Sequence, residues 1–472
     1  MVKTGNNNYD AVIIGSGIGG LVCGCYLAKA GMKVLIAEQH HKPGGYCTSF
    51  KRKGFTFDAA PHCFGSYRQD GIMRKILGEL AVDKKLTIIR PDPSDIIITP
   101  DFKIHFWNEL GETVRELQES FPAESSRIKD FIDLLLGRGE PNAFPRMRNL
   151  TFKQLLDHYL TNDKLKAILS IPFFGVGGLP SYLMSAYVGS KLFSEFLLDG
   201  GYYPQGGMQT LSDALAMRFS EFGGELRLSS RVIKIRTKNS KVTGVVVENS
   251  DFIPTRNVIS NCDARQTFSQ LLGKDKIEKE FYDQLHRMVP SVSNYILYLG
   301  MKEHFLPPFN PGTFVYIFPH YDLEKAFLAA QHGDTAGDSG FALRISHDKT
   351  SINAIMLAPF KNSTYWMNNK DRFLHSLLER IEKCAIPDLS QHILFKEAAT
   401  PQTLYRYTLN YKGASFGWAG IPSQLAISEF NKPSFIQGLY LSGHWTTLGV
   451  GISGTAYVGY GTAKLILRKE KI

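Results

Sequence analysis

Residues 9–38 read YDAVIIGSGIGGLVCGCYLAKAGMKVLIAE and decide the fold of the N-terminal region. A short β-branched apolar run, AVII, leads directly into the pattern G-x-G-x-x-G at Gly15, Gly17 and Gly20. An amphipathic helical pattern follows, and a second apolar run, KVLIAE, ends at Glu38. Strand, glycine loop, helix and second strand in this order predict a Rossmann-type βαβ unit of the α/β class.

The glycines of this loop have separate physical roles beside a phosphate group. Gly15 allows the tight turn, Gly17 lets the backbone approach a pyrophosphate, and Gly20 allows close packing of the helix. The helix N-terminus supplies N–H groups and the positive end of its dipole. Glu38, 21 residues after Gly17, can accept hydrogen bonds from a ribose diol. This arrangement favours a cofactor with a non-phosphorylated adenosine ribose, which is NAD or FAD.

The residues after the second strand distinguish these two cofactors. NAD enzymes continue with further βα units, whereas here HHKPGGYCTSFKRKGFTFDAAPH intervenes, with a predicted hairpin around residues 51–54. The pair Gly44 and Gly45 lets the backbone pass close to a flat or charged group. The segment therefore favours FAD, because this cofactor extends beyond its ADP moiety.

Length and composition describe an ordinary globular protein with more than one core. The chain has 472 residues, of which 43% are hydrophobic and 21% charged, and this length exceeds the usual size of a single core. The net charge of +10 suits a phosphate-bearing cofactor, an anionic membrane surface or nucleic acid, and equally a basic surface without a partner. No arginine-rich helix or aromatic-basic repeat is present, so a nucleic-acid partner is not expected.

The cysteines and histidines predict neither a disulfide framework nor a metal site. The six cysteines form no C-x-x-C pair, so we expect reduced, mostly buried thiols. The neighbours His40 and His41 cannot converge on one metal ion in a regular strand. The first apolar run contains Gly-Ser-Gly and no small-residue cleavage site follows it, which argues against a signal peptide. We therefore expect a cytoplasmic protein and leave contact with a membrane surface open.

Residues 167–190, AILSIPFFGVGGLPSYLMSAYVGS, contain no charged side chain. Their length would allow a transmembrane helix, but prolines and glycines interrupt the middle of the segment. Two interpretations remain: a buried core segment, or the lining of an apolar tunnel or membrane-dipping entrance. The aromatic segment FLPPFNPGTFVYIFPHY, residues 305–321, fits the same tunnel and equally an aromatic-rich core.

Five segments in order along the chain resemble the phytoene-desaturase-like flavoproteins, a superfamily that includes carotenoid isomerases, retinol saturases and, more distantly, amine oxidases. They are the N-terminal segment as far as FDAAPH, YYPQGGMQTLSDALAMRFSEFGGELRLSSRVIKI (202–235), VISNCDARQTFSQLLG (258–273), TPQTLYRYTLNYKGASFGW (400–418) and GLYLSGHWTTLGVGISGTAYVGYGTAKLIL (438–467). The superfamily often has Arg at the position of Tyr46. The pieces GGYC and FDAAPH are closer to the retinol-saturase and isomerase branches than to the bacterial desaturases.

The resemblance implies a Rossmann-type, glutathione-reductase-like FAD domain with an inserted α+β substrate domain. The FAD domain would consist of residues 1–65, 200–290 and 400–472, and the substrate domain of residues 66–199 and 291–399. Val232 would meet the adenine through its backbone, and the last glycine-rich segment would approach the flavin. The residues expected to contact FAD are Gly15, Gly17, Ile18, Gly19, Gly20, Glu38, Gly44, Gly45, Val232, Gly443, His444, Gly449, Val450 and Gly451.

The resemblance also implies which side chains lie near the reacting atoms. Asp58, His62 and His444 are the candidate catalytic residues, and Trp445 is a further candidate for the wall of the active site. The alternative for Asp58 is a structural hydrogen bond, and for His62 a packed position in the core. His444 could instead contact the cofactor, and Trp445 could belong to the core. The cofactor would then supply the redox chemistry.

The expected function is that of an FAD-dependent oxidoreductase acting on the CH–CH groups of an apolar polyene or polyisoprenoid. The reaction would be desaturation, isomerisation or saturation, with hydride transfer at flavin N5. A flavin amine oxidase on the same scaffold is the second hypothesis. A non-catalytic isoprenoid-binding protein of the prenyl-protein escort type is the third. The expected partner is an apolar small molecule, and the sequence leaves the oligomeric state open.

Overall fold

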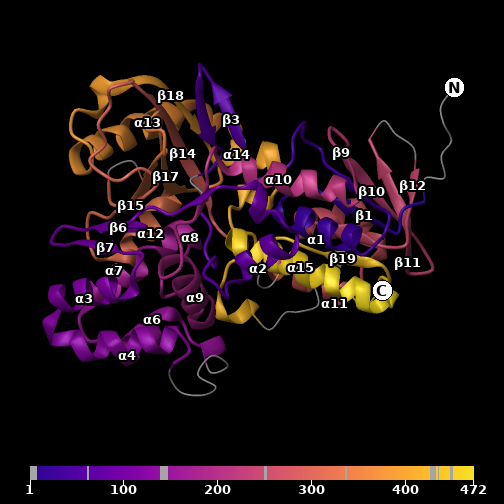
Figure 1. Cartoon of the computed structure of the whole chain (residues 1–472), viewed down its shortest axis with the longest axis horizontal. Coiled ribbons are helices and arrows are strands. Elements are labelled where there is room, and N and C mark those ends of the chain that lie inside the picture. The colour runs from indigo at the N-terminus through magenta and orange to yellow at the C-terminus, as the bar shows by residue number, and fades with distance from the viewer. Residues whose placement is uncertain are drawn as a thin grey trace.

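The computed structural model of the chain describes residues 8–60, 63–138, 147–248, 252–334, 337–425, 432–433, 435–446 and 450–471. Figure 1 shows its elements gathered around two larger β-sheets, one in each half of the molecule. Strands from distant parts of the chain meet in both sheets, as the mixture of colours in each half shows.

A five-stranded parallel sheet lies in one half, and the predicted Rossmann-type βαβ unit is at its centre. Every neighbouring pair of strands is parallel. The residues of the two central strands are all buried, as is typical of parallel strands that are covered on both faces. The α/β class is therefore confirmed. In sheet order the strands are β19 (Leu439–Leu441), β13 (Val258–Ser260), β1 (Ala11–Ile14), β2 (Val34–Ala37) and β9 (Glu225–Arg227).

Helices cover one face of this sheet, and a small antiparallel sheet covers the other. Apolar side chains of alternate residues in β1 pack into two different clusters, one with the helices and one with the small sheet. The helices are α1 (Ile18–Lys29), α10 (Met208–Glu221) and α15 (Gly451–Glu470). The small sheet consists of β10 (Val232–Lys238), β11 (Lys241–Val247) and β12 (Phe252–Pro254), and α11 (Lys279–Arg287) lies beside it.

The other half contains a seven-stranded mixed sheet. Its neighbouring strands are antiparallel except for the pair β15 and β6, which is parallel. In sheet order the strands are β18 (Ile393–Ala399), β14 (Ser293–Met301), β17 (Ser351–Ala358), β16 (Phe341–Ile345), β15 (Phe314–Ile317), β6 (Asp95–Ile98) and β7 (Lys103–Phe106). A mixed sheet with helices agrees with the expected α+β substrate region.

Two helical layers enclose the seven-stranded sheet. The long helix α13 (Ser363–Cys384) packs on one face through its buried aromatic and aliphatic side chains. The opposite face meets the largest apolar cluster of the protein, to which several shorter helices contribute. These helices are α3 (Leu110–Ser120), α4 (Ser125–Leu135), α6 (Phe152–Tyr159), α7 (Asp163–Ser170), α8 (Phe173–Val176), α9 (Ala186–Leu192), α12 (Leu323–His332) and α14 (Pro401–Thr408).

The uncharged segment 167–190 is mainly a core segment, as the first of its two interpretations predicts. Most of its side chains are buried in this cluster, and prolines and glycines divide it among α7, α8 and α9. Gly175 and Val176, at the end of α8, line a cavity. Among the described residues, no helix has both the length and the apolar character needed to cross a membrane.

The hairpin that the sequence predicts around residues 51–54 is present. Its strands are β3 (Ser49–Arg52) and β4 (Phe55–Asp58). Lys53 and Gly54 have positive φ angles of 47° and 88° at the turn. The ring of Phe55 covers Gly300 of β14, so the hairpin leans on the seven-stranded sheet. The remaining elements are α2 (Ile72–Glu79) and the short pair β5 (Ile88–Ile89) and β8 (Tyr203–Pro204).

Candidate cofactor and substrate site

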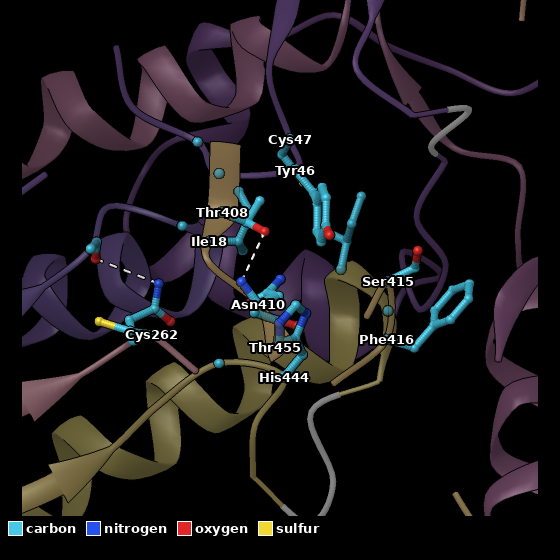
Figure 2. A pocket seen from close by; sticks show the side chains of 18 of the residues that line it. Ile18, Tyr46, Cys47, Cys262, Thr408, Asn410, Ser415, Phe416, His444 and Thr455 are labelled. Atoms are coloured by element: carbon cyan, nitrogen blue, oxygen red, sulfur yellow. Dashed lines mark hydrogen bonds between the residues drawn. The ribbon is translucent and has the colours of Figure 1, made fainter. Parts of the chain in front are cut away.

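One continuous cavity runs from the glycine loop of the parallel sheet to the wall of the mixed sheet. Its empty volume is about 1560 Å³, counting its open mouth. Its lining residues come from both halves of the molecule, so the cavity spans the region between the glycine loop and the mixed sheet. Figure 2 shows its middle part, where Tyr46, His444, Ser415 and Phe416 lie around the same space.

The glycine loop forms a cradle that side chains would fill. Gly15 turns the chain with φ of 94°, and Gly17 pairs with Gly44 as an isolated β-bridge. A Cβ atom on Gly17 would lie 2.8 Å from Asn261 Nδ2, and one on Gly44 would lie 2.5 Å from the carbonyl oxygen of Cys47. Gly17 precedes α1 and gives it no side-chain cap, so the N–H groups of the first turn remain for an anionic ligand.

Glu38 is buried at the edge of the cavity and is fixed by the backbone around it. Its Oε2 accepts hydrogen bonds from the backbone N–H of Ser16 at 2.7 Å and from the Ser16 hydroxyl at 2.8 Å. Its Oε1 accepts one from the N–H of His40 at 2.8 Å. Because a carboxylate has about four acceptor positions, Glu38 retains capacity for one more donor.

The expected cofactor residues that line the cavity come from four separate segments of the chain. They are Gly15, Gly17, Ile18, Glu38, Gly44, Gly45, Val232, Gly443, His444 and Gly451. Gly19 and Gly20 lie in the first turn of α1 against Asn261, and Val450 immediately precedes α15. Gly449 is outside the described residues.

The candidate catalytic residues have different environments. His444 lines the cavity, its ring centroid is 6.1 Å from that of Tyr46, and burial lowers its pKa to about 4. It is therefore neutral near pH 7. Asp58 is not among the cavity-lining residues, and its carboxylate accepts hydrogen bonds from the Ser49 hydroxyl, the Tyr203 hydroxyl and the N–H of Met208. His62 is outside the described residues.

Trp445 belongs to the core of the first half. Only 1% of it is exposed, and its indole N–H donates to Asn410 Oδ1 at 2.8 Å. The indole N–H of Trp418 donates to the backbone oxygen of Trp445, and the two rings meet edge to face. Trp445 therefore supports the cavity wall from behind.

Several cavity residues do not follow from the sequence pattern. Cys63 and Asp95 line the chamber next to the mixed sheet, together with Phe196. Phe314 and Tyr316 also line it and lie within the aromatic segment 305–321 that the sequence associates with a tunnel. In the sequence, Asp95 is a single acid at the start of the apolar run DIII. The same pattern occurs where a strand begins in solvent, so it does not identify a cavity residue.

The residues present fit a flavin dinucleotide. Asn261 Oδ1 is buried and has no hydrogen-bond partner among the described residues. A Cβ atom added to Gly19 would lie 2.8 Å from this oxygen, and one added to Gly443 would lie 2.4 Å from it. The oxygen therefore lies at the crowded end of the glycine cradle. A bound ligand with hydrogen-bond donors could satisfy this oxygen. No group of three His, Cys, Asp or Glu residues able to hold a metal ion occurs in the described part of the chain.

Sequence comparison gives matches along nearly the whole chain. A family model described as flavin-containing amine oxidoreductase matches residues 18–322, more than half of the chain. The chloroplastic prolycopene isomerase of Daucus carota is 27% identical, over 96% of this chain and 79% of its own length. The lycopene-forming phytoene desaturase of Pantoea ananas is 25% identical, over 96% and 98%. The all-trans-retinol 13,14-reductase of Danio rerio is 24% identical, over 92% and 82%.

Solved structures share the fold over the same extent. An oxidoreductase from Methanosarcina mazei superposes with a TM-score of 0.67, at 17% identity, covering 96% of this chain and 99% of its own. Putrescine oxidase bound to putrescine superposes with a TM-score of 0.65, at 15% identity, covering 98% and 99%. These similarities concern the arrangement of the two sheets and their helices.

Proposed function

The chain belongs to the flavin-containing amine oxidoreductase family, and on this premise we propose that it is an FAD-dependent oxidoreductase of an apolar polyene or isoprenoid. The relatives named for prolycopene, phytoene and retinol, aligned over more than nine-tenths of the chain, support this class of substrate. The proposed reaction changes C=C bonds by desaturation, isomerisation or saturation.

The continuous cavity carries the proposal. It joins the glycine cradle and Glu38 to a chamber whose walls include Val176, Phe196, Phe314 and Phe416. Aromatic and aliphatic walls favour an apolar ligand and keep water away from it. A cofactor in the cradle and an apolar substrate in the chamber would therefore meet inside one cavity.

The residues of the cradle would hold FAD by its ADP moiety. Glu38 would accept a hydrogen bond from the adenosine ribose, and the first turn of α1 would face the pyrophosphate. Val232 would meet the adenine, and Gly443 and Gly451 would leave room for the flavin. When bound, FAD supplies hydride exchange at N5, and this is the redox part of the reaction.

The side chains around the chamber orient the substrate and control its protons. His444 is neutral near pH 7 because burial lowers its pKa, so it can donate or accept one hydrogen bond without adding a charge. We propose that it contacts the cofactor or the substrate. Asp58 would support the β3–β4 hairpin through its three hydrogen bonds. A catalytic role for Asp58 or His62 remains a proposal.

The proposed domain division fits the origin of these residues. The cofactor domain would comprise residues 1–65, 200–290 and 400–472, and it supplies the cradle. The substrate domain would comprise residues 66–199 and 291–399, and it supplies the aromatic chamber wall. We propose an apolar small molecule as the partner of this second wall.

Anaerobic incubation with defined substrates tests the function. The purified protein is expected to be yellow and to release FAD on denaturation. Oxidised and reduced enzyme are incubated separately with phytoene, lycopene isomers and retinol, and the products are separated by chromatography. Conversion of at least one polyene is expected. The matched control is protein stripped of flavin, which should leave every polyene unchanged.

Three outcomes would contradict the proposal. A colourless protein that does not take up FAD would favour the non-catalytic escort type of function. A yellow protein that changes no polyene in either redox state would contradict the substrate class. Release of hydrogen peroxide with amines, in the absence of polyene conversion, would favour the flavin amine oxidase instead.

A further inference from the structure

The far wall of the chamber carries two polar groups in otherwise apolar surroundings. Asp95 of β6 and Tyr316 of β15 both line the cavity, although they are only 4% and 1% exposed. The strands are parallel neighbours in which Phe314 stands opposite Asp95 and Tyr316 opposite Ile97. Residues two apart share a face of a strand, so both polar groups belong to the cavity side of the sheet.

The hydrogen-bonding capacity of Asp95 is mostly unused among the residues that the structure describes. Its Oδ2 accepts one hydrogen bond, from the Ser94 hydroxyl at 2.7 Å. Arg90 and Arg344 act on it through their charges, and no ion pair among the described residues includes Asp95. The guanidinium of Arg90 donates to the backbone oxygen of Gly200, and that of Arg344 donates to the backbone oxygen of Gly312. A carboxyl group with up to four acceptor positions therefore faces the chamber with one filled.

Tyr316 presents a second unused polar group beside it. In the described part of the chain its hydroxyl forms no hydrogen bond, and its ring packs against Gly175. A Cβ atom on Gly175 would lie 3.1 Å from the Tyr316 oxygen. Both residues line the cavity, so their unused hydrogen-bonding capacity is open to a ligand group in the chamber.

We propose that Asp95 and Tyr316 bind a hydroxyl group at one end of the polyene or isoprenoid substrate. This inference rests on the proposed function and narrows its substrate class to alcohols. A pure hydrocarbon would leave both groups unpaired in the complex. A hydroxyl group both donates and accepts, so it can pair with the Asp95 carboxyl and with the Tyr316 hydroxyl at the same time.

The charges around Asp95 favour an alcohol over an amine or an acid. Arg90 and Arg344 both lower the pKa of Asp95, so their positive charges act at this position and disfavour a substrate ammonium group. Burial raises the pKa of Asp95 to about 7, so both the ionised and the neutral form are present near neutrality. The ionised form repels a carboxylate, whereas a hydroxyl donates to the ionised form and accepts from the neutral one.

The other two titratable groups at this wall, Cys63 and Tyr316, stay uncharged. Cys63 lies next to Asp95, and burial together with the Asp95 charge raises the pKa of its thiol to about 11. The pKa of Tyr316 is raised well above its ordinary value by burial, with smaller effects of Asp95 and Cys63. Both groups are therefore neutral when the substrate binds.

A matched pair of ligands tests the proposal. Retinol and its deoxy analogue, in which hydrogen replaces the hydroxyl group, are titrated against the FAD-loaded full chain, and Kd is measured by ligand absorbance. Wild-type protein is expected to bind retinol at least about tenfold more tightly than the analogue. Asp95→Leu should remove this preference by weakening only retinol, and Tyr316→Phe should reduce it. The control is Asp101→Leu, which replaces an exposed acid in the turn between β6 and β7. It should leave both Kd values unchanged.

Folding and the proposed function are checked separately. Flavin absorbance and Tm show that each variant is folded, and Tyr316→Phe provides the test if Asp95→Leu does not fold. Equal Kd values for retinol and the analogue in wild-type protein would overturn the inference, as would an unchanged preference in both variants. Tighter binding of retinoic acid or retinylamine than of retinol would also overturn it. Conversion of hydrocarbon polyenes by the wild-type protein, without any preference for retinol over its deoxy analogue, would leave the oxidoreductase proposal standing and reject this one.

Discussion

Glu38 combines a structural role in the glycine loop with a proposed role in cofactor binding. Its carboxylate accepts three hydrogen bonds from Ser16 and His40, and it still reaches the cavity. Ser16 joins β1 to α1, so the same carboxylate holds the glycine loop at the end of the second strand. A substitution here is expected to affect both the loop and the ligand.

Replacing Glu38 with Ala should weaken FAD binding by about tenfold or more. The reason is that a charged hydrogen-bond acceptor contributes roughly 1.5–3 kcal/mol, and the Ala variant also leaves the Ser16 N–H without its partner. The measurement is a fluorescence titration of the apoprotein with FAD. Glu38→Gln is the matched control, because it keeps one acceptor oxygen and should lose less affinity. Equal affinity of the Ala variant and the wild type would remove Glu38 from the cofactor site.

Asp95 should make the stability of the apoprotein fall as pH rises. Its folded-state pKa is raised to about 7 by burial, whereas an unfolded Asp titrates near 3.9. Below pH 4 both states are protonated, and between pH 4 and 7 the unfolded state releases its proton first. The folded state is therefore destabilised progressively in this window, and the effect levels off above pH 7.

The substitution Asp95→Asn removes this titration. Relative to the wild type, the variant should therefore become more stable as pH rises. From pH 5 to pH 8 the difference in unfolding free energy between the variant and the wild type should grow by about 2–3 kcal/mol in favour of the variant. Urea unfolding at both pH values measures it. Other titrating groups are common to both proteins and cancel. A difference that stays constant with pH would show that Asp95 is ionised at pH 5.

At the scale of elements, α15 depends on a close approach to α1. A Cβ atom on Gly459 would lie 2.4 Å from the backbone oxygen of Gly19, whereas one on Gly461 would meet nothing within 4 Å. Gly459 is buried and Gly461 is exposed in the same helix. The two glycines are therefore a matched pair for the same substitution.

Gly459→Ala should destabilise the protein by about 1–3 kcal/mol, because the added methyl group forces α15 away from α1. It should also weaken FAD binding, since Gly19 belongs to the first turn of α1. Gly461→Ala should stabilise the protein by about 0.5–1 kcal/mol through helix propensity alone. Chemical denaturation and FAD titration measure both effects. Destabilisation of equal size in the two variants would contradict the packing argument.

Elements with local signals are the ones that the sequence predicts well. The βαβ unit and the β3–β4 hairpin follow from glycines and apolar runs that are close together in the chain, and both are present as expected. Asp95 could not be placed, because its position in the chamber depends on the pairing of β6 with β15, more than 200 residues later. For the uncharged segment 167–190, periodicity could not decide between core and tunnel. Most of its residues are buried in the core, and Gly175 and Val176 line the cavity.

At the scale of the whole molecule, FAD should stabilise the fold by mass action. The cradle combines β1, α1, β10 and α15, so the ligand binds only when these elements are assembled. At a free FAD concentration 100 times its Kd, the gain is about 2.7 kcal/mol. Differential scanning fluorimetry should show a Tm that rises by several degrees with FAD concentration. The Glu38→Ala variant should need a higher FAD concentration for the same rise in Tm. A Tm that does not depend on FAD concentration would contradict cofactor binding to the folded state.

The order of strands in the parallel sheet also has a consequence for synthesis of the protein. β1 leaves the ribosome early. Its neighbour β13 pairs on its other edge with β19, which is synthesised much later, and α15 is synthesised after β19. A nascent chain that ends before residue 439 therefore exposes an unpaired edge of β13 and lacks the helix that packs on Gly19. Such an edge attracts other strands, so chaperones have a defined target on the unfinished chain. If the cradle binds FAD as proposed, the cofactor can bind only after the residues of the cradle near β19 and α15 have been synthesised.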